Sequence, residues 1–295
     1  MFTLAKVKLF TDSSADLSDD IYQQFDISVV PFYTTFDKKT YFKERKDIST
    51  LDFYKKLRTE NVFPATSLPS AADYDDAFRP CVEEGMDIVC LNLSSKFSGS
   101  HQNARNAAEE LKNDFPDRII RVIDTMQAAS AQGIILIQAA RMLNDGLSAD
   151  EIADRIDEIK HTARVFFTLD SLEYLRKGGR IGKASAFAGA LLNIKPILVC
   201  KDGELHPAAK VRGRQKALDK VLSLAEEYVG SEKDEYDFLL SHADCYGEAE
   251  AFFEKVKGKG LKFDWPIMEL GTTIGSHTGP TVIDIGMVKR YKPKE

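Results

Sequence analysis

Short runs of β-branched and aliphatic residues alternate with helical patterns through the first half of the chain, and this alternation limits the possible folds more than any other feature. Strands are predicted at residues 7–10, 27–36, 88–93 and 119–123. Helices are predicted at residues 70–84, 99–113 and 128–143. Strands that alternate with helices usually lie side by side in a mostly parallel sheet with helices on both faces, and we expect that arrangement here.

Hairpin signals replace the alternation in the second half. Asp202-Gly203, a dipeptide typical of hairpin turns, separates two predicted strands. Strands are predicted at residues 165–169, 196–200, 205–211, 238–241, 267–270 and 282–288, and helices at 215–228 and 248–256. We therefore expect an α/β protein of two domains, a parallel-sheet N-terminal domain at residues 1–165 and an α+β C-terminal domain at residues 166–295.

Charge and cysteine content exclude several classes of function. The net charge of −6 disfavours a nucleic-acid partner, because proteins that bind phosphate backbones usually carry a basic surface. The four cysteines lack the spacing of metal ligands, so neither a metal site nor a disulfide framework is expected. The longest apolar stretch, residues 133–140, is too short to span a bilayer, and the N-terminus lacks a secretory signal. We expect a cytoplasmic protein with no integral membrane segment.

Hydroxyl-bearing side chains follow the predicted strands of the first half. They are Thr11, Ser13 and Ser14, then Thr66 and Ser67, then Ser94, Ser95 and Ser98, and finally Thr125. Ligands of open α/β sheets collect at the carboxyl ends of the strands, and helix starts favour anions through their free N–H groups. One interpretation is a site for a small anionic head such as a carboxylate. The other is plain helix capping, for which serine and threonine are common residues.

Two glycine-rich segments contain further polar groups. His277 stands within residues 275–280, where it could donate to an anion or titrate near neutral pH, or could be an incidental histidine of a surface turn. Arg180 follows a glycine pair at 178–179, which fits phosphate handling or, alternatively, a basic helix end stopped by glycine. Neither a Walker loop nor a G-x-G-x-x-G after the first strand is present, so a nucleotide site within this chain is not expected.

Together these segments resemble the DegV family over nearly the whole chain. The order and spacing of several short motifs carry the resemblance. The motifs are Asp12-Ser13-Ser14-Ala15-Asp16-Leu17, Thr66-Ser67-Leu68-Pro69-Ser70, Ser94-Ser95-Lys96-Phe97-Ser98-Gly99-Ser100, Asp124-Thr125, Gly178-Gly179-Arg180-Ile181, Lys195-Pro196, Arg212-Gly213-Arg214 and Gly275-Ser276-His277-Thr278-Gly279-Pro280.

The resemblance implies a long-chain fatty acid buried between the two domains and an ATP-binding fatty acid kinase subunit as partner. That partner would phosphorylate the carboxylate of the bound lipid, and the acyl-phosphate would feed phospholipid synthesis. The residues implied to hold the carboxylate are Thr66, Ser98, His277 and Ser95. Those implied to face the phosphate or the kinase are Arg180 and Arg214. The lipid is a ligand, and no catalytic residue, metal or cofactor is expected in the chain itself.

Three positions depart from the usual pattern of the family. Leu68 stands where glutamine is usual, Ser100 where threonine is usual, and Thr281 where glycine is usual. None of the three removes an implied carboxylate ligand. Thr281 is expected to alter the shape of the last loop if the backbone there adopts a positive φ, a conformation that favours glycine.

Two other classes of function stay open. Ser98, His277 and Asp12 could imitate a serine hydrolase triad, although no G-x-S-x-G motif is present. A lipid carrier or sensor without a kinase partner is the other alternative. The preferred acyl chain depends on the residues that close the tunnel, for which residues 128–143 and 187–192 are candidates.

Overall fold

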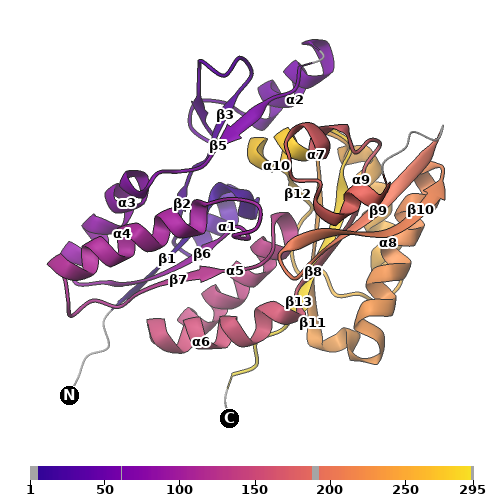
Figure 1. The fold of residues 1–295 in the computed structure, drawn as a ribbon. Helices are drawn as coiled ribbons and strands as arrows, with labels where there is room; N and C mark the ends of the chain where they lie inside the picture. Colours follow the sequence, from indigo (N-terminus) through magenta and orange to yellow (C-terminus); the bar gives the residue numbers. More distant parts are fainter. Residues whose placement is uncertain (1–5, 61, 188–192, 294–295) are drawn as a thin grey trace.

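The first half of the chain builds a four-stranded parallel sheet, as the alternating pattern predicts (Figure 1). The computed structural model describes residues 6–60, 62–187 and 193–293. The strand order is β2-β1-β6-β7, and every pair of neighbours is parallel. The strands are β1 (Val7–Asp12), β2 (Ile27–Val30), β6 (Asp87–Asn92) and β7 (Ile120–Asp124).

Helices cover both faces of this parallel sheet. One face packs against α3 (Ala71–Glu83) and α4 (Ser100–Asp114), through a buried cluster that includes Phe10 and Phe78. The other face packs against α1 (Asp19–Gln24), α5 (Ala129–Asn144) and α6 (Ala149–Ile159). A sheet buried on both faces explains why its central strand β6 has no exposed residue.

The single strand predicted at residues 27–36 is wrong. It breaks at Pro31, which has no N–H group to donate to a ladder. Beyond the break, β3 (Tyr33–Thr35) joins a separate antiparallel sheet of order β4-β3-β5. Its partners are β4 (Phe42–Lys43) and β5 (Ala65–Ser67), and α2 (Thr50–Glu60) lies between them in the sequence. This small sheet carries the segment around Thr66 away from the main sheet (Figure 1).

A mixed six-stranded sheet of order β10-β9-β8-β13-β11-β12 fills the second half. Its strands are β8 (Arg164–Thr168), β9 (Ile194–Lys201), β10 (Glu204–Arg212), β11 (Tyr236–His242), β12 (Met268–Glu269) and β13 (Ile283–Lys289). Asp202 and Gly203 both have positive φ and form the β9–β10 hairpin turn that the sequence predicts. Helices α8 (Arg214–Val229) and α9 (Tyr246–Lys257) pack on one face. The shorter α7 (Glu173–Lys177) and α10 (Thr272–Thr278) contact each other.

Helix α5 lies between the two large sheets and contacts strands of both. Two glycines permit the close approach. A Cβ on Gly133 would lie 2.6 Å from the carbonyl oxygen of Ala15, and one on Gly286 would lie 2.4 Å from the Ser130 hydroxyl. The predicted fold class, a parallel-sheet N-terminal part followed by an α+β C-terminal part, is confirmed. The domain boundary at residue 165 stays a prediction.

Candidate functional site

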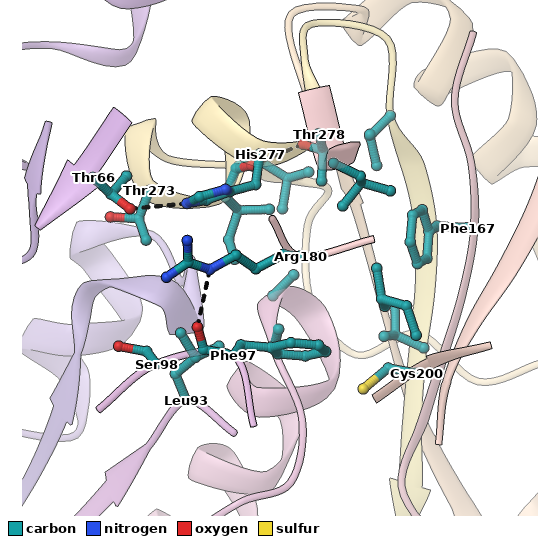
Figure 2. A pocket seen from close by; sticks show the side chains of 18 of the residues that line it. Thr66, Leu93, Phe97, Ser98, Phe167, Arg180, Cys200, Thr273, His277 and Thr278 are labelled. Carbon is teal, nitrogen blue, oxygen red and sulfur yellow. Dashed lines mark hydrogen bonds between the residues drawn. The ribbon is translucent and has the colours of Figure 1, made fainter. Parts of the chain in front are cut away.

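An apolar cavity lies between the small sheet, the carboxyl end of β6 and the six-stranded sheet (Figure 2). Its volume is about 100 Å³. The apolar lining residues are Phe32, Leu68, Leu93, Phe97, Ala128, Ala129, Val165, Phe167, Leu175, Leu205, Leu270, Ile274 and Val282. Residues 188–192, part of a predicted tunnel segment, lie outside the described residues, whereas Ala128 and Ala129 do line the cavity.

Four of the sequence-predicted site residues line this cavity together. Thr66 comes from β5, Ser98 from the loop before α4, His277 from α10 and Arg180 from the loop after α7. Thr66, Ser98 and His277 are half-buried and Arg180 is exposed, so this polar end is the mouth of the cavity. Figure 2 shows Arg180 between the Thr66–His277 pair and the Phe97–Ser98 segment.

A hydrogen bond of 2.8 Å joins Thr66 Oγ1 to His277 Nε2. Burial, with a smaller contribution from Arg180, lowers the pKa of His277 to about 4, so the ring is neutral near pH 7. Nδ1 of this ring is buried without a partner. A buried nitrogen without a partner costs less as an acceptor lone pair than as an N–H group. Nδ1 is therefore the unprotonated nitrogen, and Nε2 carries the proton. His277 then donates to Thr66, and the Thr66 O–H stays free to donate into the cavity.

The two arginines differ in position. Arg180 donates from Nε to the Phe97 carbonyl at 3.1 Å and from a terminal nitrogen to the Gly178 carbonyl at 2.6 Å, which holds its charge at the cavity mouth. Arg214 does not line the cavity. Its guanidinium binds the Glu248 carboxylate and the Thr281 carbonyl. The two residues predicted to act together therefore lie in different environments, and only Arg180 can meet a ligand at the mouth.

Ser95 is placed elsewhere than its predicted role requires. Its side chain is exposed and does not line the cavity, and its N–H donates to Asp124. The neighbouring Ser94 turns inward and donates to the Gly203 carbonyl at 2.8 Å. This bond ties the β9–β10 hairpin to the loop before α4, and the Arg180 contact to Phe97 ties the same loop to the segment after α7. The loop is thus held to the second half of the chain at two points.

The three departures from the family pattern have local explanations. Leu68 lies at the cavity mouth and adds an apolar contact there. The Ser100 hydroxyl donates to Asp12 at 3.0 Å and lies outside the cavity lining. Thr281 does not have positive φ, and its hydroxyl accepts the N–H of Asp170 at 3.0 Å. The last loop therefore does not need glycine at this position.

A serine hydrolase triad is not formed by the proposed residues. Both oxygens of Asp12 accept hydrogen bonds, and the donors come from Ser14, Gln132, Asn92, Leu93 and Ser100. The Nδ1 of His277, which such an aspartate would orient, has no partner. Asp12 instead holds together the ends of β1 and β6 beneath the start of α4.

Within the described residues, no group of three or more His, Cys, Asp or Glu could hold a metal ion, and no helix could cross a membrane.

Sequence reasoning missed Asp284, a buried residue that lines the cavity. Its carboxylate accepts from the Ser130 hydroxyl at 2.5 Å and from the Ser241 hydroxyl at 2.6 Å. Burial raises the pKa of Asp284 to about 7, against the opposing effect of these hydrogen bonds. The available signal was a carboxylate inside the run Val282-Ile283-Asp284-Ile285, which otherwise predicts a buried strand.

Fold and cavity define a class of two-part α/β proteins that enclose an apolar cavity with a polar mouth between two sheets. The chain belongs to the DegV family, whose profile, described as that of an uncharacterised protein family, matches residues 6–290. A DegV domain-containing protein of Clostridium perfringens is 36% identical over 278 residues, 94% of this chain and 95% of the relative.

Two solved structures share the fold along nearly their whole length. A stearic acid-binding protein of Eubacterium ventriosum has a TM-score of 0.92 and 35% identity, and the match covers 97% of this chain and 99% of that one. A fatty acid-binding DegV family protein of Thermus thermophilus has a TM-score of 0.88 and 31% identity, with 96% and 99% covered.

Proposed function

We propose that this protein binds one long-chain fatty acid in the cavity and presents its carboxylate to a separate ATP-dependent kinase subunit. One observation carries the proposal: the cavity is lined mainly by apolar side chains and gathers hydroxyl, imidazole and guanidinium groups at its exposed end. The relatives from Eubacterium ventriosum and Thermus thermophilus, which bind stearic acid and a fatty acid, support the same class of ligand.

The acyl tail supplies most of the binding free energy in this proposal. Burial of one methylene contributes about 0.8 kcal/mol, so a tail of about 14 methylenes gains on the order of 11 kcal/mol before ordering costs. Val165, Phe167 and Leu205 offer buried apolar surface for it. A ligand of this kind needs few polar contacts to bind tightly.

The carboxylate must be solvated at the mouth, because an unpaired buried charge is costly. The Ser98 hydroxyl accepts the Ser100 N–H at 3.2 Å and keeps its own proton for a ligand. Thr66 does the same when His277 donates to it, so the two hydroxyls can hold one carboxylate between them. Arg180 adds a positive charge at the same end, already engaged by two backbone carbonyls.

A carboxylate held by hydroxyls at an exposed mouth remains open to a second protein. The partner kinase would transfer the γ-phosphoryl group of ATP to a carboxylate oxygen, which gives an acyl-phosphate and ADP. In this proposal the chain itself is a non-catalytic lipid-binding subunit. Arg180 would face the incoming phosphate, whereas Arg214 would only support the last loop through Glu248 and Thr281.

The test combines native mass spectrometry with a matched pair of variants. The purified protein should carry one fatty acid, identified in an organic extract, and mixing it with ATP and the kinase subunit should yield acyl-phosphate. The double variant Thr66→Val, Ser98→Ala should lose at least tenfold in affinity, or about 1.4 kcal/mol. The control Ser95→Ala changes a serine of the same loop outside the cavity and should bind normally. If the protein takes up neither palmitate nor oleate, the lipid-binding proposal is contradicted. If it binds lipid but yields no acyl-phosphate with the kinase subunit, the kinase role is contradicted and the protein is a lipid carrier.

A further inference from the structure

Among the described residues that line the cavity, Asp284 contributes the only carboxyl group. Asp284 is 2% exposed and stands on β13 two residues after Val282, in a wall whose other side chains include Val165, Phe167 and Cys200. Small-molecule sites usually place a few polar groups in an apolar lining, and these groups fix the orientation and identity of the ligand. Asp284 is therefore the group in this wall that could recognise a polar substituent on a ligand tail.

Strand register places Asp284 beside Phe167, on the side of the cavity away from the mouth. Asp284 pairs with Phe167 across β13 and β8, so both side chains lie on the same face of the sheet. Val165 lies two residues before Phe167 on the same face and pairs with Cys200. Figure 2 shows Phe167 and Cys200 on the side away from Thr66 and Ser98. A fatty acid with its carboxylate at the mouth would thus bring the distal half of its tail to Asp284.

The Asp284 carboxyl group retains capacity for one more hydrogen bond. Oδ1 accepts from the Ser130 hydroxyl at 2.5 Å and from the Ser241 N–H at 3.2 Å, whereas Oδ2 accepts only from the Ser241 hydroxyl at 2.6 Å. In the ionised form a carboxylate oxygen has two lone pairs, so Oδ2 then has one unused. A methylene cannot use this lone pair, whereas a ligand hydroxyl could donate a hydrogen bond to it.

We infer that the preferred ligand is a long-chain fatty acid with a hydroxyl group on the distal half of its chain, and that Asp284 selects it by accepting a hydrogen bond from that hydroxyl. The inference rests on the proposed function and names its substrate class. Ser130 and Ser241 hold the carboxyl group in place, because both of its oxygens are fixed by protein donors. A site that must hydrogen-bond a ligand hydroxyl discriminates more strongly than an apolar pocket, because the unpaired polar group opposes the analogue that lacks it.

The experiment measures the affinities of stearate, 3-hydroxystearate and 12-hydroxystearate for the delipidated full-length protein, by displacement of a fluorescent fatty acid. Wild-type protein should bind 12-hydroxystearate at least tenfold more tightly than stearate, and 3-hydroxystearate no more tightly, because its hydroxyl lies near the mouth. Asp284→Leu should reverse the preference. Asp284→Asn should retain part of it, because the amide oxygen still accepts a hydrogen bond.

The outcomes separate the inference from the proposed function. Equal affinity for stearate and 12-hydroxystearate in the wild-type protein overturns the role of Asp284 and leaves the proposed function standing. Absence of binding for all three ligands overturns both. The comparison of ligands on the wild-type protein decides the question even where Asp284→Leu does not fold.

Discussion

Replacement of Asp284 by asparagine should change the stability of the ligand-free protein in a pH-dependent way. Burial raises the pKa of Asp284 from its ordinary value of 3.8 to about 7. Between these two pH values the native protein holds a proton that the unfolded chain has released, so the unfolding free energy falls as the pH rises from about 4 to about 7. About three pH units at 1.36 kcal/mol each give a loss on the order of 4 kcal/mol. Asparagine carries no such charge and should avoid this loss.

Urea denaturation of both proteins in buffers between about pH 4 and about pH 8 measures the effect. The quantity to plot is the unfolding free energy of Asp284→Asn minus that of the wild type. Other titrating groups, such as His277 with its lowered pKa, are present in both proteins and largely cancel. The difference should rise with pH and level off above about pH 7, on top of a constant offset from altered hydrogen bonds. A difference that does not vary with pH would refute the claim that burial of this carboxyl group dominates its titration.

Two glycine substitutions test the mouth of the cavity and its last loop. Gly178→Ala should weaken fatty-acid binding about tenfold with little loss of stability, because the new Cβ would lie 2.2 Å from His277 Nδ1 and displace the ring, as a binding titration would show. Gly279→Ala should lower the unfolding free energy by about 1–3 kcal/mol in urea denaturation, since φ is +77° and the Cβ would lie 2.6 Å from the Tyr174 ring. Gly247→Ala is the control for both, because its Cβ would meet nothing within 4 Å, and a similar effect in it would contradict both explanations.

Sequence pattern predicted the elements whose stability is local or regular. The parallel strands β1, β6 and β7 are buried aliphatic runs, and the β9–β10 turn needs the positive φ that Asp202-Gly203 adopts readily. The strand over residues 27–36 was mispredicted because hydrophobic content outweighed Pro31, the residue that ends the ladder. The proline at position 31 is thus the local feature that ends β2 and separates it from β3.

Helix α10 could not be predicted from its own residues. The segment Thr272–Thr278 is short, and it contains β-branched residues and Gly275, so an isolated peptide of this sequence would not be helical. Contacts from elsewhere stabilise it: a Cβ on Gly275 would lie 2.6 Å from the Tyr54 hydroxyl, which shows how closely α2 packs against it. Tertiary packing converts the predicted turn around His277 into a helix that aims the imidazole at Thr66.

The candidate site was predictable as a set of residues but not as a geometry. Thr66, Ser98 and His277 meet at one cavity mouth, whereas Ser95 lies only three residues before Ser98 and faces solvent. The backbone path of the loop before α4 determines which serine faces the cavity, and the residue types in the loop do not predict that path. Asp284 escaped notice because a single carboxylate in an apolar strand resembles an ordinary alternation between inside and outside.

The position of α5 has a consequence for how the chain folds. Leu9 and Val89 of the first sheet and Leu239 and Val288 of the second belong to one continuous core cluster around this helix. A cut near residue 165 would leave the first fragment with a helix that has lost half of its apolar surroundings, and the second with a bare sheet face. Because both sheets share this cluster, we expect neither fragment to fold stably alone and the two sheets to unfold together in one cooperative transition.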